Sequence, residues 1–547
     1  MLRFPKIFLI LIVFVISFCS NDSGDNHSME NYLNGGEISI VNRRFIDSYG
    51  RQIILNGVNY INKNSSENYL NTDSARVYAK MHEMGINCIR LGLIWDAIEP
   101  EPGKFNEKFL DEIEKKIQMA AEHNIYIMLD MHQDLYSKKY SDGAPLWATL
   151  DENLPHQTGA IWSDAYLMSP AIQKAFDNFW DNKKAPDGIG IQDHYLNMWK
   201  HVAKRFLKYN NVLGYDIMNE PFNGSNANEI MPLILMEYAK MLVEKSGKNP
   251  PSEQELMMMW ADENTRLEIL KKLSDSTSYS RLLDAAFEPV KRFETTKLQA
   301  FYQKAADALR EIDSTGILFF EHNYFSNPGI RSSIEPVKNK DGKVDPNQAY
   351  AAHGYDLVVD TKDDGNQSNS RVDLIFTRIS QTSQRMNVPV LVGEWGAFSG
   401  LGDDFVQPVQ FILSLFDKYH FGNTYWAYHS DMYEKTAFKK GLQRPYPQFV
   451  SGELKEFSFN REKGIFICKW TEKSGIQAPT VIYLPHLKAL SKESIRFDTD
   501  NENAIVQSIA GSDAGYVIVP VSEKNADRFV EFHIIAEQQS IPFENNK

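Results

Sequence analysis

Short apolar runs alternate with helix-like segments over most of this chain of 547 residues, and this alternation limits the folds it can adopt. Residues 106–123 place Leu110, Ile113 and Ile117 on one helical face, and the strand-like run 125–129 follows. Strands that are apolar throughout and separated by helices belong to a parallel sheet covered on both faces. About eight such units fit between residues 53 and 440. We therefore expect an α/β fold, a (β/α)8 TIM barrel.

The domain organisation follows from where this rhythm begins and ends. We assign residues 37–445 to the barrel domain, which starts with a hairpin ahead of its first strand. Residues 134–190, rich in aromatic side chains, and 223–300, with a helical pattern, are expected to be insertions on the active-site face. From 446 to 547 seven short strand-like runs follow without helices, so we expect a C-terminal β-sandwich.

The N-terminus has the pattern of a targeting signal. Arg3 and Lys6 are followed by an apolar run of twelve residues, too short for a membrane-spanning helix, which needs roughly 20. The run ends at Cys19, as in a bacterial lipoprotein signal whose cysteine becomes the lipidated first residue. Residues 1–19 are therefore interpreted as the signal, and the polar segment 20–36 as a flexible tether.

These features predict that the protein is exported. We favour the interpretation that it is a lipoprotein of the bacterial cell envelope. The alternative is an ordinary signal cleaved within 17–20, which would leave a secreted or periplasmic protein. The favoured interpretation gives the protein a lipid anchor in a membrane, besides any contact with the membrane that holds its substrate.

The net charge limits the kinds of partner, and the few cysteines limit the possible disulfides. A formal net charge of −14 disfavours nucleic acid and an anionic membrane surface as the main partner, so we expect a neutral substrate. Besides Cys19 there are only Cys88 and Cys468, both in strand-like runs, where small buried thiols are expected. The sequence therefore supports no disulfide framework.

Two glutamates, Glu220 and Glu394, each stand at the end of a strand-like apolar run. In a β/α-barrel the chemistry gathers where the strands end, and two facing carboxyl groups can cleave a glycosidic bond. One such glutamate alone is more often a loop start or a salt-bridge partner. Two of them, several strands apart, favour a catalytic pair.

Further polar residues follow other predicted strands. Asp130, His132 and Asp134 alternate, so an extended chain would place them on one face, where a metal site or a sugar site would fit. No second histidine stands at ligand spacing nearby, so we expect sugar binding, no metal and no cofactor. Arg90 lies in the preceding strand and belongs to the same constellation.

The remaining candidates lie near later strand ends. Asn219 could donate a hydrogen bond to a sugar hydroxyl, and the alternative is a cap on the next turn. His353 and Tyr355 follow a strand, where the tyrosine hydroxyl could hold a catalytic carboxylate; a half-buried core tyrosine is the alternative. Trp426 offers a flat face for a sugar ring, or is simply a buried barrel tryptophan.

In their order and strand positions, these candidate site residues resemble those of glycoside hydrolase family 5. Three further motifs are similar to its endoglycoceramidase branch: Asp-Met-His-Gln-Asp-Leu-Tyr at 130–136, Gly-Glu-Trp-Gly at 393–396 and Arg-Pro-Tyr-Pro at 444–447. The similarity covers roughly residues 37–535. The residues shared with the family are Arg90, His132, Asn219, Glu220, Pro221, His353, Tyr355, Glu394 and Trp426.

The resemblance implies retaining hydrolysis of the β-linkage between a glycan and ceramide, with a glycosphingolipid as substrate. It assigns Glu220 the acid/base role and Glu394 the nucleophile role. In a retaining enzyme the two carboxyl groups lie about 5–5.5 Å apart. Lys63, Asp134 and Asn219 match positions that contact the sugar nearest the lipid in that branch.

Three other functions remain open at this point. A β-glucosylceramidase, another β-glucosidase or another family 5 β-glycanase would use the same carboxylate pair on a different substrate. A surface protein could bind glycans or lipids without cleaving them, although the paired glutamates with their supporting residues count against it. A purely structural envelope protein would leave the aromatic insertion and the glutamates unexplained.

Overall fold

The computed structural model of the protein describes residues 31–534 except 73, 248, 499–503 and 523. The chain divides into two compact units, Met1–Asn34 and Gly35–Lys547. Of the first, only the short helix η1 (Asn31–Leu33) and Asn34 are described. The predicted signal with Cys19 and most of the predicted tether lie outside the described residues.

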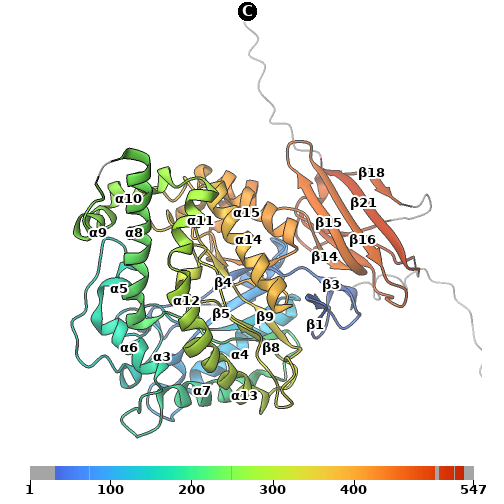
Figure 1. Ribbon diagram of the computed structural model, residues 1–547. Helices are drawn as coiled ribbons and strands as arrows, with labels where there is room; N and C mark the ends of the chain where they lie inside the picture. Colours follow the sequence, from blue (N-terminus) through green and yellow to red (C-terminus); the bar gives the residue numbers. More distant parts are fainter. Residues whose placement is uncertain (1–30, 73, 248, 499–503, 523, 535–547) are drawn as a thin grey trace, which may run out of the picture. The chain divides into compact units, whose positions relative to one another are not determined.

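Eight parallel strands form the sheet at the centre of this unit (Figure 1). Their order is β11-β13-β4-β5-β6-β7-β8-β9, and a parallel bridge between Tyr350 and Val390 joins the two ends. The predicted TIM barrel is confirmed. In chain order its strands are β4 (Asn56–Tyr60), β5 (Cys88–Ile94), β6 (Tyr126–His132), β7 (Val212–Asp216), β8 (Ile317–Phe320), β9 (Gln348–Tyr350), β11 (Leu391–Val392) and β13 (Gly422–Tyr425).

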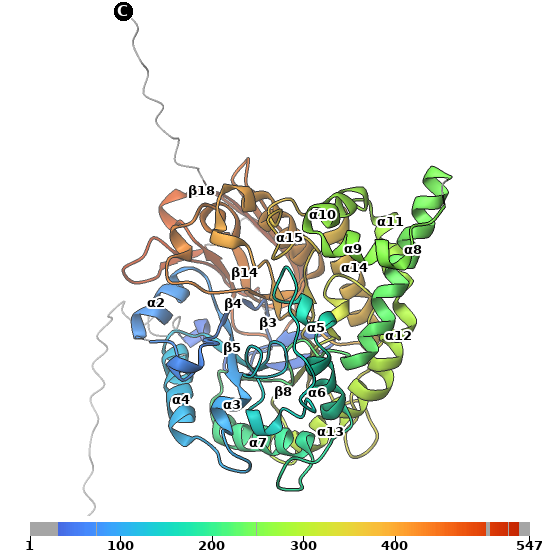
Figure 2. The same cartoon turned by 90° about the vertical axis from the view of Figure 1, so that its left-hand side faces the viewer.

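Helices surround the strands (Figure 2), and their apolar faces pack on the sheet. Residues 106–123 form a helix as predicted, and the side chain of Asn106 caps its first turn by accepting from Phe109 N. One connection departs from the regular pattern, because 321–347 contains only the short helix η6 (Tyr324–Ser326). The helices between strands are α2 (Ala75–Glu83), α3 (Trp95–Ile98), α4 (Glu107–Glu122), α7 (Ile191–Phe206), α13 (Gln299–Arg310), α14 (Asn369–Met386) and α15 (Val406–Tyr419).

The two predicted insertions are helical excursions after β6 and β7. Several aromatic residues of the first are core residues: Phe176 and Phe179 are buried, and Tyr166 packs on Phe222 with ring centroids 4.7 Å apart. Among the described residues, no helix has both the length and the apolar character to cross a membrane. The insertion helices are α5 (Asp164–Met168), α6 (Pro170–Trp180), α8 (Ala227–Ser246), α9 (Glu253–Ala261), α10 (Glu263–Lys272), α11 (Ser276–Asp284) and α12 (Phe287–Phe293).

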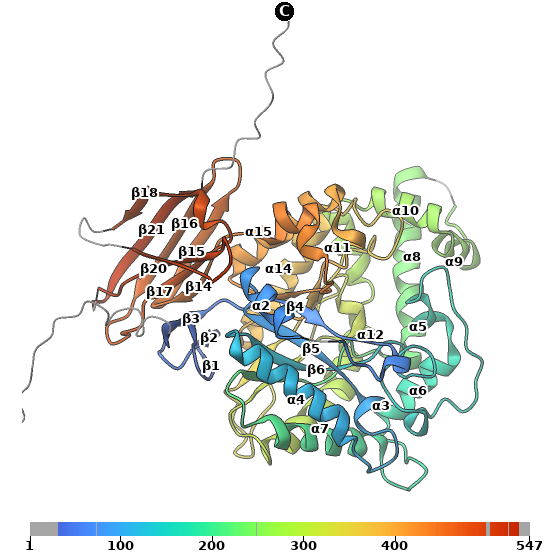
Figure 3. The same ribbon diagram turned by 180° about the vertical axis from the view of Figure 1, so that it is seen from behind.

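The C-terminal strands form two antiparallel sheets (Figure 3). One has the order β15-β16-β21-β18, and the other β1-β2-β3-β14-β17-β20-β19. The predicted N-terminal hairpin is thus part of this second sheet, where β3 pairs with β14. The strands are β1 (Ser39–Val41), β2 (Arg44–Ile46), β3 (Gln52–Ile53), β14 (Tyr446–Val450), β15 (Gly452–Asn460), β16 (Ile465–Glu472), β17 (Thr480–Leu484), β18 (Leu490–Phe497), β19 (Ile505–Ser508), β20 (Gly515–Val519) and β21 (Ala526–Ile534).

The C-terminal sheets attach to the barrel through buried tyrosines. Tyr446 donates a hydrogen bond to the carbonyl of Gly85 at 2.8 Å, and Tyr483 donates to that of Glu83 at 2.7 Å. Both acceptors lie at the end of α2, and the Tyr483 ring fills the space a side chain at Gly85 would occupy. This contact fixes the sheets on the barrel end away from the strand termini that carry the glutamates.

Candidate active site

Glu220 and Glu394 both lie at the carboxyl end of the barrel strands. Glu220 follows β7 after a short loop, whereas Glu394 begins β12 (Glu394–Trp395), which pairs in parallel with β10 (His353–Gly354). One carboxylate oxygen of each glutamate and a ring nitrogen of His353 lie within 4.8 Å of one another. Retaining glycosidases hold their carboxyl groups about 5–5.5 Å apart and inverting ones about 6.5–9.5 Å apart. The arrangement fits the retaining reaction.

The backbone at Glu220 is held in a conformation that few residues adopt. Its φ of 44° is in the left-handed region, which costs a residue other than glycine about 1 kcal/mol or more. The Glu220 N–H donates to Glu321 Oε2 at 2.8 Å, and the side-chain amide of Gln133 donates to the neighbouring carbonyl of Asn219 at 2.9 Å. These contacts stabilise the turn and aim the carboxyl group inwards.

The Glu220 carboxyl group is buried, and Oε1 receives its contacts. The amide of Asn327 donates to Oε1 at 2.6 Å, and His353 Nδ1 lies 3.0 Å from the same atom. Burial raises the pKa of Glu220 to about 7; the charges of Glu394 and Asp134 act in the same direction, and His353 opposes them. Glu220 therefore keeps a proton close to neutral pH, as a general acid must.

Glu394 is surrounded by donors. Arg90 Nη1 donates to Oε1 at 2.7 Å, and the Tyr355 hydroxyl donates to Oε2 at 2.9 Å. Both contacts stabilise the ionised carboxylate, the form that attacks carbon. The tyrosine hydroxyl thus makes the contact that the sequence suggested, and the two glutamates have different environments.

Arg90 is fully buried beneath the two glutamates and organises the floor of the site. Each of its three nitrogens donates hydrogen bonds, and the surrounding carboxylates raise its pKa even though burial acts against them. Removing this cation would take a charged partner from four buried carboxylates at once. Its acceptors are Asn59, Asp130, Asp216, Asn219, Glu321 and Glu394, at 2.7–3.1 Å.

His353 lies between three carboxylates. Its Nδ1 is 3.0 Å from Glu220 and 3.6 Å from Glu394, and its Nε2 is 3.2 Å from Glu321. Burial lowers the pKa of His353, but the charges of Glu321 and Glu394 outweigh it and raise the pKa well above its usual value. The ring is therefore a cation that lies between the carboxyl groups of Glu220 and Glu394.

A second group of predicted residues forms the wall beside the glutamates. The rings of His132 and Trp426 stack with centroids 5.2 Å apart, and the Lys63 ammonium lies 4.4 Å from the Trp426 centroid. Lys63 also pairs with Asp134, whose pKa falls to about 2 because Lys63 and His132 outweigh burial. His132 Nε2 is buried, has no hydrogen-bond partner among the described residues and lies 3.8 Å from Asp134 Oδ2.

All ten residues predicted for the site in the described part of the chain gather here, at one cavity or directly beneath it. The cavity has a volume of about 600 Å³. The glutamates, Lys63, His132 and Trp426 are among the residues that line it. The helical insertion and two loops add apolar side chains to the same lining: Met231, Ile234, Trp260, Leu282, Leu283, Ile330 and Leu357.

Within the part of the chain that the structure describes, three clusters of buried acidic and histidine side chains have the spacing of metal ligands. Each already has a cation of the protein within it or beside it. Lys63 pairs with Asp134 in the first cluster, His353 lies between the glutamates in the second, and Arg90 joins Asp130, Asp216 and Glu321 in the third. The expectation that no metal binds stays a prediction, and the charge balance favours it.

Several residues of the site were not found from the sequence. Glu321 directly follows the strand-like run 316–320, so the rule that found the two catalytic glutamates would have found it too. Asn327 and Asp142 carry no such signal, because their positions depend on the loop geometry. Asn59 lies within β4 and was not singled out there. Asp142 accepts from the backbone of Asp134 at 3.0 Å and supports the lysine pair.

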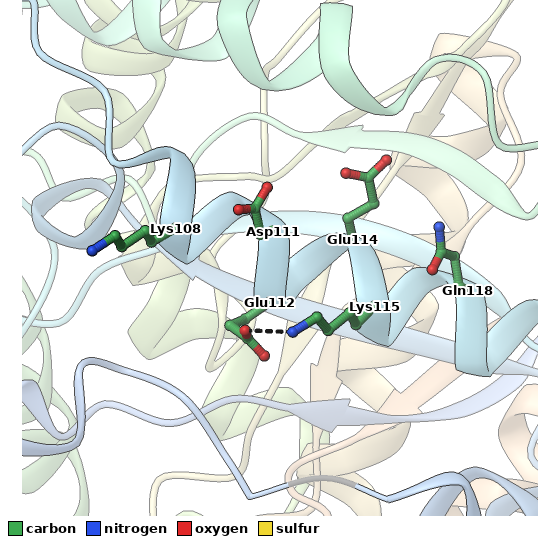
Figure 4. Close-up of a pocket in the computed structure, with 6 residues that line it drawn as sticks. All are labelled: Lys108, Asp111, Glu112, Glu114, Lys115 and Gln118. Atoms are coloured by element: carbon green, nitrogen blue, oxygen red, sulfur yellow. Dashed lines mark hydrogen bonds and ion pairs between the residues drawn. The ribbon is translucent and has the colours of Figure 1, made fainter.

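Another hollow lies on the exposed face of α4 (Figure 4). It is lined by charged side chains that pair with neighbours: Glu112 accepts from Lys115 at 2.7 Å, and Arg205 donates to Glu114 at the same distance. Solvated ion pairs of this kind on a helix surface form no binding site.

Comparison with known proteins agrees with this geometry. A family model described as cellulase (glycosyl hydrolase family 5) matches residues 46–432, and one for the glycoside hydrolase family 5 C-terminal domain matches 444–524. Endoglycoceramidase I of Rhodococcus hoagii (strain 103S) is 23% identical over 490 residues, 87% of this chain and 86% of that one.

Two further similarities differ in their extent. The endoglycoceramidase of Cyanea nozakii is 34% identical over 211 residues, 33% of this chain, and the match spans only 41% of that protein's length. Among solved structures, endo-glycoceramidase II from Rhodococcus sp. in complex with ganglioside GM3 shares the fold. Its TM-score is 0.67 at 23% identity, with 91% of this chain and all of that one covered.

Proposed function

The chain belongs to glycoside hydrolase family 5, and on that premise we propose that it is a retaining endoglycoceramidase, cleaving the β-glycosidic bond between the glycan and the ceramide of glycosphingolipids. One observation carries the proposal. A close carboxylate pair, one member protonated near neutral pH and the other held by donors, lines a cavity together with a tryptophan, a lysine and a set of apolar side chains.

The proposed reaction has two steps. Glu394 attacks the anomeric carbon while Glu220 gives its proton to the glycosidic oxygen, so the bond to the lipid breaks and ceramide leaves as an alcohol. Glu220, now ionised, takes a proton from water as the water oxygen attacks the same carbon. This releases Glu394 and restores both carboxyl groups, and the sugar keeps its β-configuration.

The substrate class is inferred from the two kinds of side chain, polar and apolar, that line the cavity. Trp426 and His132 present a flat surface with hydrogen-bonding groups around it, which suits a sugar ring. The apolar side chains suit hydrocarbon chains, which a purely polar glycan would not need. The relatives named as endoglycoceramidases support the same substrate for this chain.

A product assay tests the proposal directly. Purified protein is incubated with lactosylceramide, a ganglioside and glucosylceramide, and the products are identified by mass spectrometry. We expect intact oligosaccharide and intact ceramide from the first two. Release of single sugars only would indicate a glucosidase, and binding without cleavage would contradict the enzymatic proposal.

We also propose that the protein is exported and anchored through a lipidated Cys19, on the strength of the basic start and the apolar run that ends at this cysteine. Metabolic labelling with a palmitate analogue, followed by mass spectrometry of the N-terminal peptide, tests this. We expect a lipid-modified Cys19 at the mature N-terminus, lost in a Cys19→Ala variant. An unmodified N-terminus created within 17–20 would contradict the anchor.

A further inference from the structure

A chain of three buried side chains, linked by hydrogen bonds, runs from Tyr350 in β9 to the acid/base carboxyl group of Glu220. The Tyr350 hydroxyl lies 2.5 Å from His322 Nδ1, and His322 Nε2 lies 3.0 Å from Asn327 Oδ1. The amide nitrogen of Asn327 lies 2.6 Å from Glu220 Oε1. None of these three residues was predicted from the sequence, and the mechanism above does not use them.

The direction of donation along this chain is set at Glu220. The His353 ring faces Glu220, Glu321 and Glu394, so it is a cation and its Nδ1–H donates to Glu220 Oε1. The Asn327 amide nitrogen faces the same oxygen, so a proton on Oε1 would have to point at one of two N–H groups. Oε1 is therefore an acceptor in both protonation states of Glu220 as long as both donors are present.

The rest of the chain follows from this orientation. With its nitrogen towards Glu220, Asn327 accepts through Oδ1, so His322 carries its hydrogen on Nε2 and Tyr350 donates to Nδ1. Burial lowers the pKa of His322 to about 3, so its ring is neutral and one tautomer suffices. The backbone of Asn327 is also fixed, because Tyr355 N donates to its carbonyl at 3.1 Å.

We propose that Asn327, oriented by His322 and Tyr350, is a positioning residue that confines the catalytic proton of Glu220 to Oε2. Two donors occupy Oε1, whereas no described residue hydrogen-bonds Oε2. Glu220 lines the cavity, and the proton held on Oε2 is the one that would pass to the leaving oxygen. The inference rests on the proposed function only in that Glu220 is the general acid.

This arrangement should matter only for the step in which Glu220 gives its proton to the leaving group. If Asn327 became an acceptor of the same shape, the Glu220 proton would move to Oε1 and form a hydrogen bond away from the substrate. Acid assistance to the leaving group would then be lost, while attack by Glu394 would be retained. A residue with a merely structural role would affect all substrates alike.

The test compares two soluble β-lactosides in the full-length enzyme, one with a 4-methoxyphenyl and one with a 2,4-dinitrophenyl leaving group. Asn327→Asp should lower kcat/KM for the first by at least about 100-fold and for the second by no more than about fivefold. Asn369→Asp makes the same chemical change at an exposed position of α14 and should alter neither rate. Equal losses on both substrates would overturn the proposal.

A milder variant keeps the proposal testable even if Asn327→Asp fails to fold. Tyr350→Phe removes only the first donor of the chain and contacts neither Glu220 nor the cavity. It should change the rates in the same direction, selectively for the 4-methoxyphenyl substrate and by a smaller factor. No change, or an equal change on both substrates, would contradict the role of the chain. Because both substrates are soluble aryl glycosides, the result is independent of whether the wild type cleaves glycolipids.

Discussion

Single side chains give the two catalytic glutamates their different chemistry. Burial and neighbouring negative charge favour the protonated form of Glu220, whereas Arg90 and Tyr355 donate to Glu394 and favour its anion. His353 contacts both. Pairs of carboxyl groups whose environments differ in this way are how glycosidases divide acid and nucleophile roles.

The raised pKa of Glu220 predicts the upper limb of the pH profile. The acid form is active, and since its pKa is about 7 rather than near 4.5, the acid persists through pH 6 and is lost above pH 7. For lactosylceramide we expect kcat/KM to fall about tenfold for each pH unit above about 7.5. A profile that stays flat to pH 9 would contradict Glu220 as the acid.

Removing each carboxylate separately should separate the two roles. Glu394→Gln should abolish turnover of every substrate, because no covalent intermediate can form. Glu220→Gln should cost at least about 100-fold on a glycolipid but much less on a dinitrophenyl glycoside, which departs without a proton. Initial rates on both substrates measure this, and equal losses in Glu220→Gln would reverse the assignment.

The sequence predicted the residues at the strand ends and the shared motifs, and missed those reached through loops. Glu220, His353 and Glu394 directly follow apolar runs, so their place needs only the barrel rule. Asn327 lies six residues beyond Glu321 in a connection without an α-helix, and nothing in its local sequence indicates that it contacts Glu220. Contacts of this kind depend on how loops pack.

At the scale of elements, the pairing of β7, the strand that precedes Glu220, contains an irregularity. The register between β6 and β7 shifts between Ile127 and Met128, because Leu213 is an extra residue opposite them. Gly214 follows with a φ of 152°, and a side chain there would come within 1.9 Å of the Ile317 carbonyl of β8. Only glycine allows this approach of the two strands.

Gly214→Ala should therefore be strongly destabilising. The added methyl group would push β7 from β8, and we expect a loss of more than about 2 kcal/mol in the free energy of unfolding, measured with urea. Gly402→Ala is the control, because nothing lies within 4 Å of a side chain at that exposed glycine and its φ is −71°. A loss of similar size in both variants would contradict the steric explanation.

At the scale of the folded unit Gly35–Lys547, strands from both ends of the chain share one sheet. β3 pairs with β14, and the buried guanidinium of Arg51 donates to the carbonyl of Pro479 at 3.0 Å. The alternation of strands and helices predicted the barrel correctly. It assigned the N-terminal hairpin to the barrel domain, ahead of the first barrel strand, because pairing across some 400 residues leaves no local signal.

This shared sheet predicts cooperative unfolding. Because the N-terminal strands, the C-terminal sheets and the barrel are joined by buried contacts, thermal unfolding should show one transition, with the same midpoint by far-UV circular dichroism and by tryptophan fluorescence. A chain truncated after residue 445 should be insoluble, since it would expose the surface on which Tyr446 and Tyr483 pack. Two separated transitions would indicate independent domains.

The stereochemistry of the first product tests the central claim most directly. Lactosylceramide is incubated with the enzyme in an NMR tube, and the anomeric proton of the released lactose is followed before mutarotation. The close spacing of Glu220 and Glu394 predicts that β-lactose appears first, together with intact ceramide. Initial release of α-lactose, or of galactose and glucose instead of lactose, would contradict the account.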